Sequence, residues 1–288
     1  MDPIRDEIIL APSPPFEWQR PPKFQNRLWI HLLLLALTIG NTALVGGWAY
    51  SVTILAILGC HEFGHYLTCR YYDVDASLPY FLPMPVSITG TLGAFIRIRE
   101  PIPSKRMLFD IGIAGPIAGF IVAVPALLVG VSLSRIVPIS DTGVWLGEPL
   151  LLKAASYLMW GPIADGYTLE IHQIGFAAWF GLLATALNLF PIGQLDGGHI
   201  CYAVLGRRST YVTVVMVGVT LALSYLSTSW IVWTIMLVAM LVMFGPRHPR
   251  TFDEEEPLDR TRLILAVLAA VMFALCFTPA PIEILINS

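Results

Sequence analysis

The segment His61-Glu62-Phe63-Gly64-His65 lies inside an apolar stretch, Ser51 to Tyr72, whose composition is that of a membrane-buried helix. Ionisable side chains are costly in the hydrocarbon of a bilayer, so polar groups inside a span indicate a functional site. On a helix, His61 and His65 lie one turn apart on the same face and can bind one zinc ion. Glu62 lies next to this pair, where it can remove a proton from a zinc-activated water. The segment therefore predicts a catalytic zinc site of the metalloprotease type.

The composition of the whole chain agrees with a membrane location. The sequence is 56% hydrophobic and 13% charged, which is typical of an integral membrane protein. We predict an all-α polytopic membrane protein with six to seven transmembrane helices. Two adjoining pairs of spans have almost no linker and should each form a tight helical hairpin. The predicted spans are 28–50, 51–71, 108–134, 173–192, 209–227 and 228–245, with a shorter seventh at 262–279.

The cationic residues predict the orientation of these spans. With a cytoplasmic N-terminus, every lysine and arginine except Arg135 and Lys153 falls on the cytoplasmic side. This bias follows the positive-inside rule and predicts a multi-pass protein of the cell (inner) membrane. Residues 1–27 lack the pattern of a secretory signal and are interpreted as a cytoplasmic arm. No basic block indicates nucleic acid, and the four cysteines lack the spacing of a disulfide framework.

Two segments outside the predicted helices have patterns of their own. Residues 79–98 combine β-branched residues with helix-disfavouring ones such as Pro83 and Gly90. They predict a re-entrant β-hairpin beside the histidine pair, whose exposed edge can bind an extended peptide; a plain cytoplasmic loop is the alternative. Residues 136–172 alternate acidic and apolar side chains, which predicts an amphipathic segment on the outer membrane surface.

A catalytic zinc site needs a third protein ligand and one open position, and Asp196 is the strongest candidate for that ligand. It lies in the segment 188–199, which we expect at the same membrane depth as the histidine pair. Four residues around Asp196 should loosen the helix and let the carboxylate approach the metal: Pro191, Gly193, Gly197 and Gly198. The alternative is a capping aspartate before a Gly-Gly turn.

Other polar residues are candidates for the same site. His199 is the rival third ligand, but it lies one turn after Asp196 only if the helix persists through Gly197 and Gly198. A supporting or interfacial role is therefore favoured for it. Asn188 can donate a hydrogen bond to a developing oxyanion, or it bridges two helices. The remaining histidines have no partner at ligand spacing and are interpreted as bystanders: His31, His172 and His248.

With both motifs in place, the sequence resembles the site-2 protease family of intramembrane zinc metalloproteases. The resemblance rests on HEFGH at 61–65 and NLFPIGQLDGGH at 188–199, supported by GTLGAFIRI at 90–98 and GPIAGF at 115–120. It covers about residues 51–205. The PDZ insertion and the CBS pair known from the family have no counterpart in this sequence.

The resemblance implies a role for each residue that matches the family motifs. His61, His65 and Asp196 would bind one zinc ion per chain, and Glu62 would be the general base. Asn188 would contribute to substrate handling or to stabilisation of the oxyanion.

We divide the chain into the arm at 1–27, an intramembrane metalloprotease core at 28–205 and C-terminal transmembrane helices at 206–288. The predicted function is hydrolysis of peptide bonds in or near transmembrane segments of other membrane proteins, as in regulated intramembrane proteolysis. Its partners would be those proteins and the lipid bilayer. The alternatives are a metal or proton transporter and a catalytically inactive scaffold. The ionisable groups cluster at one depth and Glu62 is present, which favours the protease.

Overall fold

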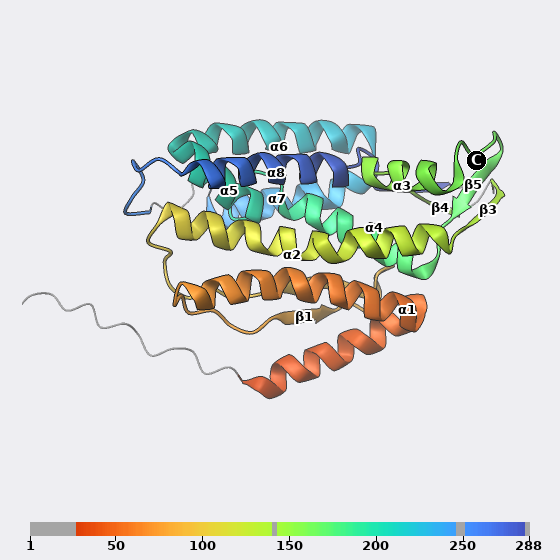
Figure 1. The fold of residues 1–288 in the computed structure, drawn as a ribbon, viewed down its shortest axis with the longest axis horizontal. Helices are drawn as coiled ribbons and strands as arrows, with labels where there is room; N and C mark the ends of the chain where they lie inside the picture. The colour runs from red at the N-terminus through yellow and green to blue at the C-terminus, as the bar shows by residue number, and fades with distance from the viewer. Residues whose placement is uncertain (1–26, 140–142, 246–250, 286–288) are drawn as a thin grey trace, which may run out of the picture.

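The computed structural model describes residues 27–139, 143–245 and 251–285, and most of them are helical (Figure 1). Of the predicted arm at 1–27, only Arg27 lies within the described residues. His248 also lies outside them. The helices lie roughly side by side along the longest axis of the molecule. They are α1 (Leu28–Tyr71), α2 (Lys105–Ser132), α3 (Leu150–Trp160), α4 (Gln173–Asn188), α5 (Asp196–Leu205), α6 (Ser209–Leu226), α7 (Ser229–Phe244) and α8 (Arg260–Cys276).

The apolar helices agree with the predicted membrane spans. In the described part of the chain, three helical segments are long and apolar enough to cross a membrane: Leu28–Tyr71, Lys105–Ser132 and Asp196–Leu226. Shorter apolar helices at Gln173–Asn188 and Ser229–Met243 overlap further predicted spans. A mostly helical membrane protein is thereby confirmed, whereas the number of spans remains a prediction.

Helix α1 is a helical hairpin, as the adjoining spans 28–50 and 51–71 predict. Its backbone leaves the helical conformation at Gly47 (φ 79°, ψ 175°), a positive φ that favours glycine. The chain reverses direction there, so α1 consists of a first arm before Gly47 and a second arm after it (Figure 1). Thr42 Oγ1 and Ser51 Oγ, one from each arm, lie 2.7 Å apart and tie the arms together near the break.

Helices α6 and α7 form the second predicted hairpin. Only Ser227 and Thr228 separate the end of α6 from the start of α7. The Thr234 hydroxyl of α7 donates to the Thr220 carbonyl of α6 over 3.0 Å, which pairs two polar groups between otherwise apolar helices. The prediction of a tight helical connection is confirmed here as well.

The predicted β-hairpin at 79–98 is also present. Strands β1 (Tyr80–Pro83) and β2 (Thr91–Phe95) pair antiparallel. The hairpin packs against the second arm of α1, where the Tyr50 hydroxyl donates to the Thr89 carbonyl over 2.9 Å. Phe81 of β1 joins a buried cluster with Ile54 of the same arm. Whether the hairpin re-enters the membrane remains a prediction.

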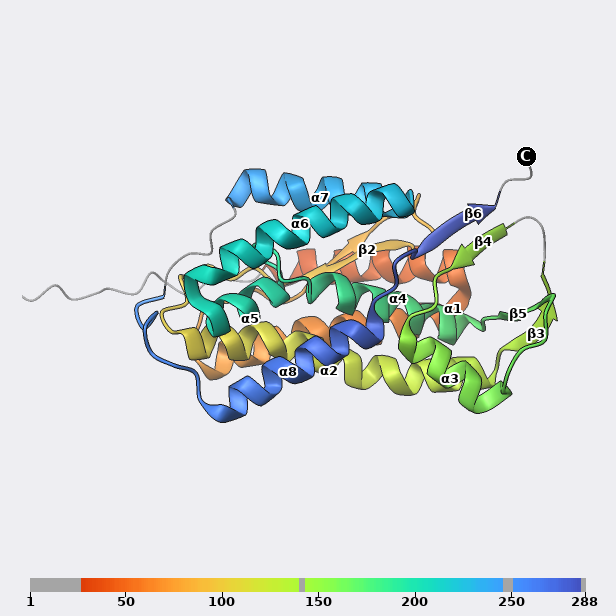
Figure 2. The ribbon, with the colours of Figure 1, turned by 90° about the horizontal axis from the view of Figure 1, so that it is seen from above.

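The segment 136–172 differs from the expectation. Helix α3 buries Leu152 and Ala155, as expected of an amphipathic helix. Four strands that the sequence analysis did not predict surround it: β3 (Arg135–Pro138) pairs with β5 (Tyr167–Glu170), and β4 (Gly143–Leu146) pairs with β6 (Ile282–Leu285). These two sheets gather at one end of the molecule (Figure 2), so the description "all-α" was wrong for this end. Strand β6 comes from far along the chain, and no local pattern could indicate that pairing.

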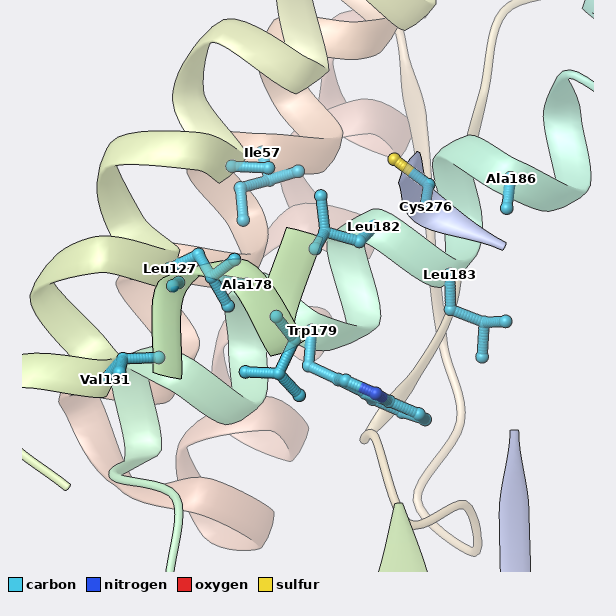
Figure 3. Close-up of a cluster of buried hydrophobic side chains, with 12 residues drawn as sticks. Ile57, Leu127, Val131, Ala178, Trp179, Leu182, Leu183, Ala186 and Cys276 are labelled. Atoms are coloured by element: carbon cyan, nitrogen blue, oxygen red, sulfur yellow. The ribbon is translucent and has the colours of Figure 1, made fainter. Parts of the chain in front are cut away.

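A buried cluster of apolar side chains joins α1, which carries His61 and His65, to α2 and α4. The cluster contains Trp179 and Leu182 of α4, Ile57 of α1 and Leu127 of α2 (Figure 3). Cys276 of α8 also belongs to it. Trp179 is fully buried, and its indole N–H donates to the Gly147 carbonyl over 2.7 Å, so its polar atom is satisfied. This packing fixes the positions of α1, α2 and α4 relative to one another.

Candidate metal centre

The second arm of α1 carries the two histidines of the first motif on one face. His61 and His65 are each 6% exposed, and their Nε2 atoms lie 3.1 Å apart. This is the arrangement that helix periodicity predicts for residues four apart. Because the two Nε2 atoms lie this close together, both can bind the same cation.

Asp196 completes the group from a different part of the chain. Its Oδ2 atom lies 3.2 Å from Nε2 of His61 and 3.3 Å from Nε2 of His65. In the described part of the chain, these three side chains form the only group of three or more potential ligands whose ligand atoms converge, all within 4.8 Å of one another. The structure thus brings together the residues proposed as ligands from the sequence.

The distances within this group fit a tetrahedral zinc ion. Zinc bonds of about 2.0–2.1 Å to nitrogen and oxygen place neighbouring ligand atoms roughly 3.3–3.4 Å apart. The three observed separations are 3.1, 3.2 and 3.3 Å. Two imidazoles and one carboxylate also form a donor set that catalytic zinc sites use, with the fourth position left open. The residues present therefore fit the metal.

A glycine-rich turn delivers Asp196 to the histidines, in a way that the sequence analysis did not foresee. The helix is interrupted between Asn188 and Asp196, at Pro191 and Gly193, as expected. Helix α5 then continues from Asp196 through Gly197 and Gly198, so the expected loosening was wrong for these two glycines. A Cβ at Gly197 would collide with the Leu189 carbonyl, and one at Gly198 with the Gly193 carbonyl. The glycines allow close packing of the turn on the helix, and that packing outweighs their low helix propensity.

The ring of His65 is oriented by a backbone carbonyl. Its Nδ1 lies 2.7 Å from the Ile111 carbonyl of α2, to which Nδ1–H donates. This hydrogen bond fixes the tautomer and leaves the Nε2 lone pair for a metal. Sequence reasoning missed Ile111, because a carbonyl contributes through its position and leaves no signal in residue type.

Helix α2 comes close to the histidines because it lacks side chains on that face. A Cβ at Gly115 would overlap the His65 ring, and one at Gly119 would lie 3.1 Å from Cβ of His61. On the facing arm of α1, a Cβ at Gly64 would lie 2.5 Å from the Ala114 carbonyl. Gly64 therefore allows α1 and α2 to approach closely, and the glycine spacing in GPIAGF was the available signal on α2.

Glu62 lies beside the three-ligand group and is 7% exposed. Its Oε1 is 4.0 Å from Nε2 of His61, and its carboxylate accepts a hydrogen bond from the backbone N–H of Ile96, directly after β2. The hairpin thus contacts the acidic side chain of the first motif. A carboxylate at this place can exchange protons with a group bound at the histidines.

The other polar candidates lie around or away from this group. The Asn188 side-chain nitrogen, at the end of α4, lies 3.3 Å from Nε2 of His61. His199 packs with its Cβ against Gly112 of α2 and is not one of the converging ligands, which agrees with an interfacial role. His31 binds the Pro79 carbonyl, and His172 caps α4.

Comparison with known proteins gives one family. The sequence model of Peptidase family M50 matches residues 49–227. The "probable zinc metalloprotease EGY2, chloroplastic" of Oryza sativa subsp. indica is 30% identical over 228 residues, covering 76% of this chain and 41% of the relative. The "probable zinc metalloprotease EGY1, chloroplastic" of Arabidopsis thaliana is 32% identical over 240 residues, covering 78% and 42%. The chain thus spans about two fifths of the length of these relatives.

Among solved structures, the site-2 protease from Methanocaldococcus jannaschii matches with a TM-score of 0.34 and 17% identity. The match covers 85% of this chain and 88% of that one.

Proposed function

This chain belongs to peptidase family M50, the site-2 proteases, and we propose that it is a zinc metalloprotease that hydrolyses peptide bonds in or near transmembrane segments of other membrane proteins. The observation that carries the proposal is the convergence of His61, His65 and Asp196 beside a buried carboxylate, Glu62. The first three residues are the proposed zinc ligands, and Glu62 is the proposed general base.

The proposed mechanism assigns one task to each side chain around the metal position. When bound, zinc supplies the Lewis acidity that polarises a peptide carbonyl and makes water more acidic. Glu62 takes the proton of the attacking water on its carboxylate and returns it to the nitrogen of the leaving amine. Asn188 directs its side-chain N–H at the carbonyl oxygen as negative charge develops there. Ile111 holds the His65 ring through its carbonyl.

The hairpin is the proposed place for the substrate backbone. Strand β2 pairs with β1 along one edge, and the residue after it contacts Glu62. An extended peptide that adds to the other edge of β2 would lie next to the general base. A helical substrate hides its amides in hydrogen bonds and must unwind before it can bind in this way. We therefore expect helix-breaking residues near the scissile bond to raise cleavage above that of a polyleucine span.

The location and division of the chain are part of the same proposal. We propose a multi-pass protein of the cell (inner) membrane with a cytoplasmic N-terminus, supported by the distribution of its cationic residues. The named relatives are chloroplastic, so the kind of membrane is to be established by localisation of the protein itself. Residues 28–205 would form the catalytic core and 206–288 its flanking helices.

The decisive test compares zinc content and cleavage in detergent-purified protein. Wild type and Glu62→Gln should each hold about one zinc ion per chain, and Asp196→Ala should hold much less. Cleavage of a membrane-anchored probe with a helix-breaking residue in its span should occur in wild type alone. Absence of zinc from refilled wild type would exclude the protease. Equal cleavage by Glu62→Gln would exclude the assigned general base.

A further inference from the structure

A cavity apart from the metal centre lies among elements that Figures 1 and 2 show at the end of the molecule opposite α5. It has a volume of about 750 Å³ and is enclosed by the β3–β5 sheet, the β4–β6 sheet and α3. This volume is in the range of sites that hold small molecules or short peptide segments. None of its lining residues belongs to the metal centre.

The deeper part of the cavity is apolar. Leu152 of α3 is 3% exposed, and Leu146, Ile171 and Phe176 around it are half-buried. The Trp179 indole N–H donates to the carbonyl of Gly147, which lies in the wall, and so connects the cavity to the main core. An occupant with apolar groups would be removed from water on this surface.

The rim of the cavity is acidic. Glu148, Glu170 and Glu283 line it with exposed carboxylates, and Lys153 is the one cationic side chain in the lining. Lys153 Nζ lies 3.9 Å from Glu148 Oε2, and Arg135 of β3 lies directly across the sheet from Glu170, so Glu283 is the carboxylate with no basic neighbour in the lining or across its strand pair. With Arg135 counted, three acidic groups stand against two basic ones, and the remaining negative charge attracts a cationic occupant and repels an anionic one.

We propose that this cavity binds a short extended segment of another polypeptide that carries lysine or arginine side chains among apolar ones. Its apolar side chains would lie on the floor around Leu152, and its cationic groups would lie at Glu170 and Glu283. The walls consist of strands of four residues, which are about 13 Å long. A wall of that length matches a few residues of extended chain better than a compact small molecule.

The source of the segment rests on the proposed function. For a protease that cuts membrane proteins, the segment that reaches this end is the flank of a substrate span, away from the scissile bond. Binding there would hold the substrate in place through contacts remote from the metal. The binding itself requires neither zinc nor cleavage, so it can be measured separately.

The test uses the detergent-purified Glu62→Gln protein, in which no cleavage should occur. The probe is a short, fluorescently labelled peptide of alternating leucine and lysine, and anisotropy against protein concentration measures its affinity. In that background, Glu170→Gln with Glu283→Gln should weaken binding roughly tenfold, because two carboxylates are neutralised without change of shape. Lys153→Gln should strengthen binding about threefold. Glu255→Gln, an exposed acidic residue elsewhere, serves as the control and should change nothing.

Two results would overturn the inference. The first is equal binding of a peptide with glutamine in place of lysine, which would show adsorption of the leucines to lipid-facing surfaces. The second is equal affinity of the double variant and its parent, which would place the peptide elsewhere. Either result leaves the metal centre untouched, because zinc content and cleavage of the membrane-anchored probe test the proposed protease independently.

Discussion

The starts of helices α2 and α5 each have an aspartate, and the two carboxylates serve different purposes. Asp253 reaches the start of α2 from a distant segment, where it accepts the Lys105 backbone N–H over 2.7 Å and the Ser104 hydroxyl over 2.8 Å. Asp196 is the first residue of α5, yet its carboxylate lies 3.2 and 3.3 Å from two imidazole nitrogens. The positive end of a helix attracts an anion in both places.

The difference shows that neighbours, rather than residue type or position in a helix, decide what such an aspartate does. Asp253 is satisfied by the backbone and side chain that it caps, so its contribution is to stability. Asp196 is directed at His61 and His65 because a tight turn brings α5 against α2, within reach of the two imidazoles. The capping interpretation that the sequence left open for Asp196 describes Asp253 instead.

The largest expected effect is on zinc content, where substitution of the two aspartates should have different results. Asp196→Asn should reduce bound zinc from about one ion per chain to below about a tenth after dialysis, because the proposed charged ligand is lost. Asp253→Asn should leave the zinc content unchanged. Metal analysis of the two purified variants measures both. Retention of zinc by Asp196→Asn would mean that this carboxylate is not a ligand.

The next prediction concerns the helix surface behind the ligands. Gly115→Ala should weaken zinc affinity roughly 10- to 100-fold, as displacement of the support of a ligand does, because the added Cβ overlaps the His65 ring. Gly218→Ala in α6 is the matched control, since a Cβ there meets nothing within 4 Å. Competition with a chelator of known affinity gives both values. Equal affinities would show that the ring moves aside without consequence.

A third prediction measures what the metal contributes to folding. Removal of zinc by a chelator should lower the thermal midpoint of wild type by roughly 8 °C, because a ligand at about a thousand times its Kd stabilises by about 4 kcal/mol. The same chelator should leave Asp196→Asn almost unchanged. Thermal unfolding in detergent, followed by fluorescence, measures the shift. If the chelator lowers the thermal midpoint equally in both proteins, the lowering does not come from loss of metal at this site.

The smallest effect is the pH dependence of Asp253. Partial burial raises the pKa of its carboxyl, but hydrogen bonds from the Lys105 backbone, Ser104 and Thr251 outweigh burial and lower the pKa below its usual value. A lowered pKa stabilises the folded state above the unfolded pKa of about 3.9, and this stability is lost as the pH falls below it. The effect should be only a few tenths of a kcal/mol, because solvent reaches this half-buried group and screens its charge.

The matching measurement compares unfolding of wild type and Asp253→Asn from neutral to acidic pH. Wild type should be slightly more stable at neutral pH, and the difference should shrink below about pH 4. A difference that grows on acidification would have the wrong sign for a carboxylate with a lowered pKa.

The local part of the site could be predicted because local geometry determines it. His61 and His65 converge through helix periodicity alone, and Glu62 follows from its place in the same motif. Asp196 was accessible through its predicted membrane depth. The hairpin at 79–98 was accessible because its prolines and glycines exclude a helix. Each of these inferences needed only a short stretch of sequence or a count of spans.

The rest depended on contacts between distant segments. The helix from Asp196 through Gly197 persists because the turn from Leu189 packs on it, a tertiary effect that helix propensity cannot anticipate. The Ile111 carbonyl leaves no mark in the sequence. The β4–β6 sheet requires a strand from far along the chain, and the cavity that it lines exists only once that pairing is made.

The glycines at the contact between α1 and α2, beside the histidines, have a consequence for how this protein tolerates mutation. Gly64, Gly115 and Gly119 contribute no functional group, yet little space exists at any of them for even a methyl group. In a saturation mutagenesis experiment selected on activity, these positions should therefore be nearly as intolerant as the ligands. A list of positions ranked by intolerance to mutation would therefore combine two kinds of residue. Some would act in the proposed chemistry, and others would be needed only because they lack a side chain.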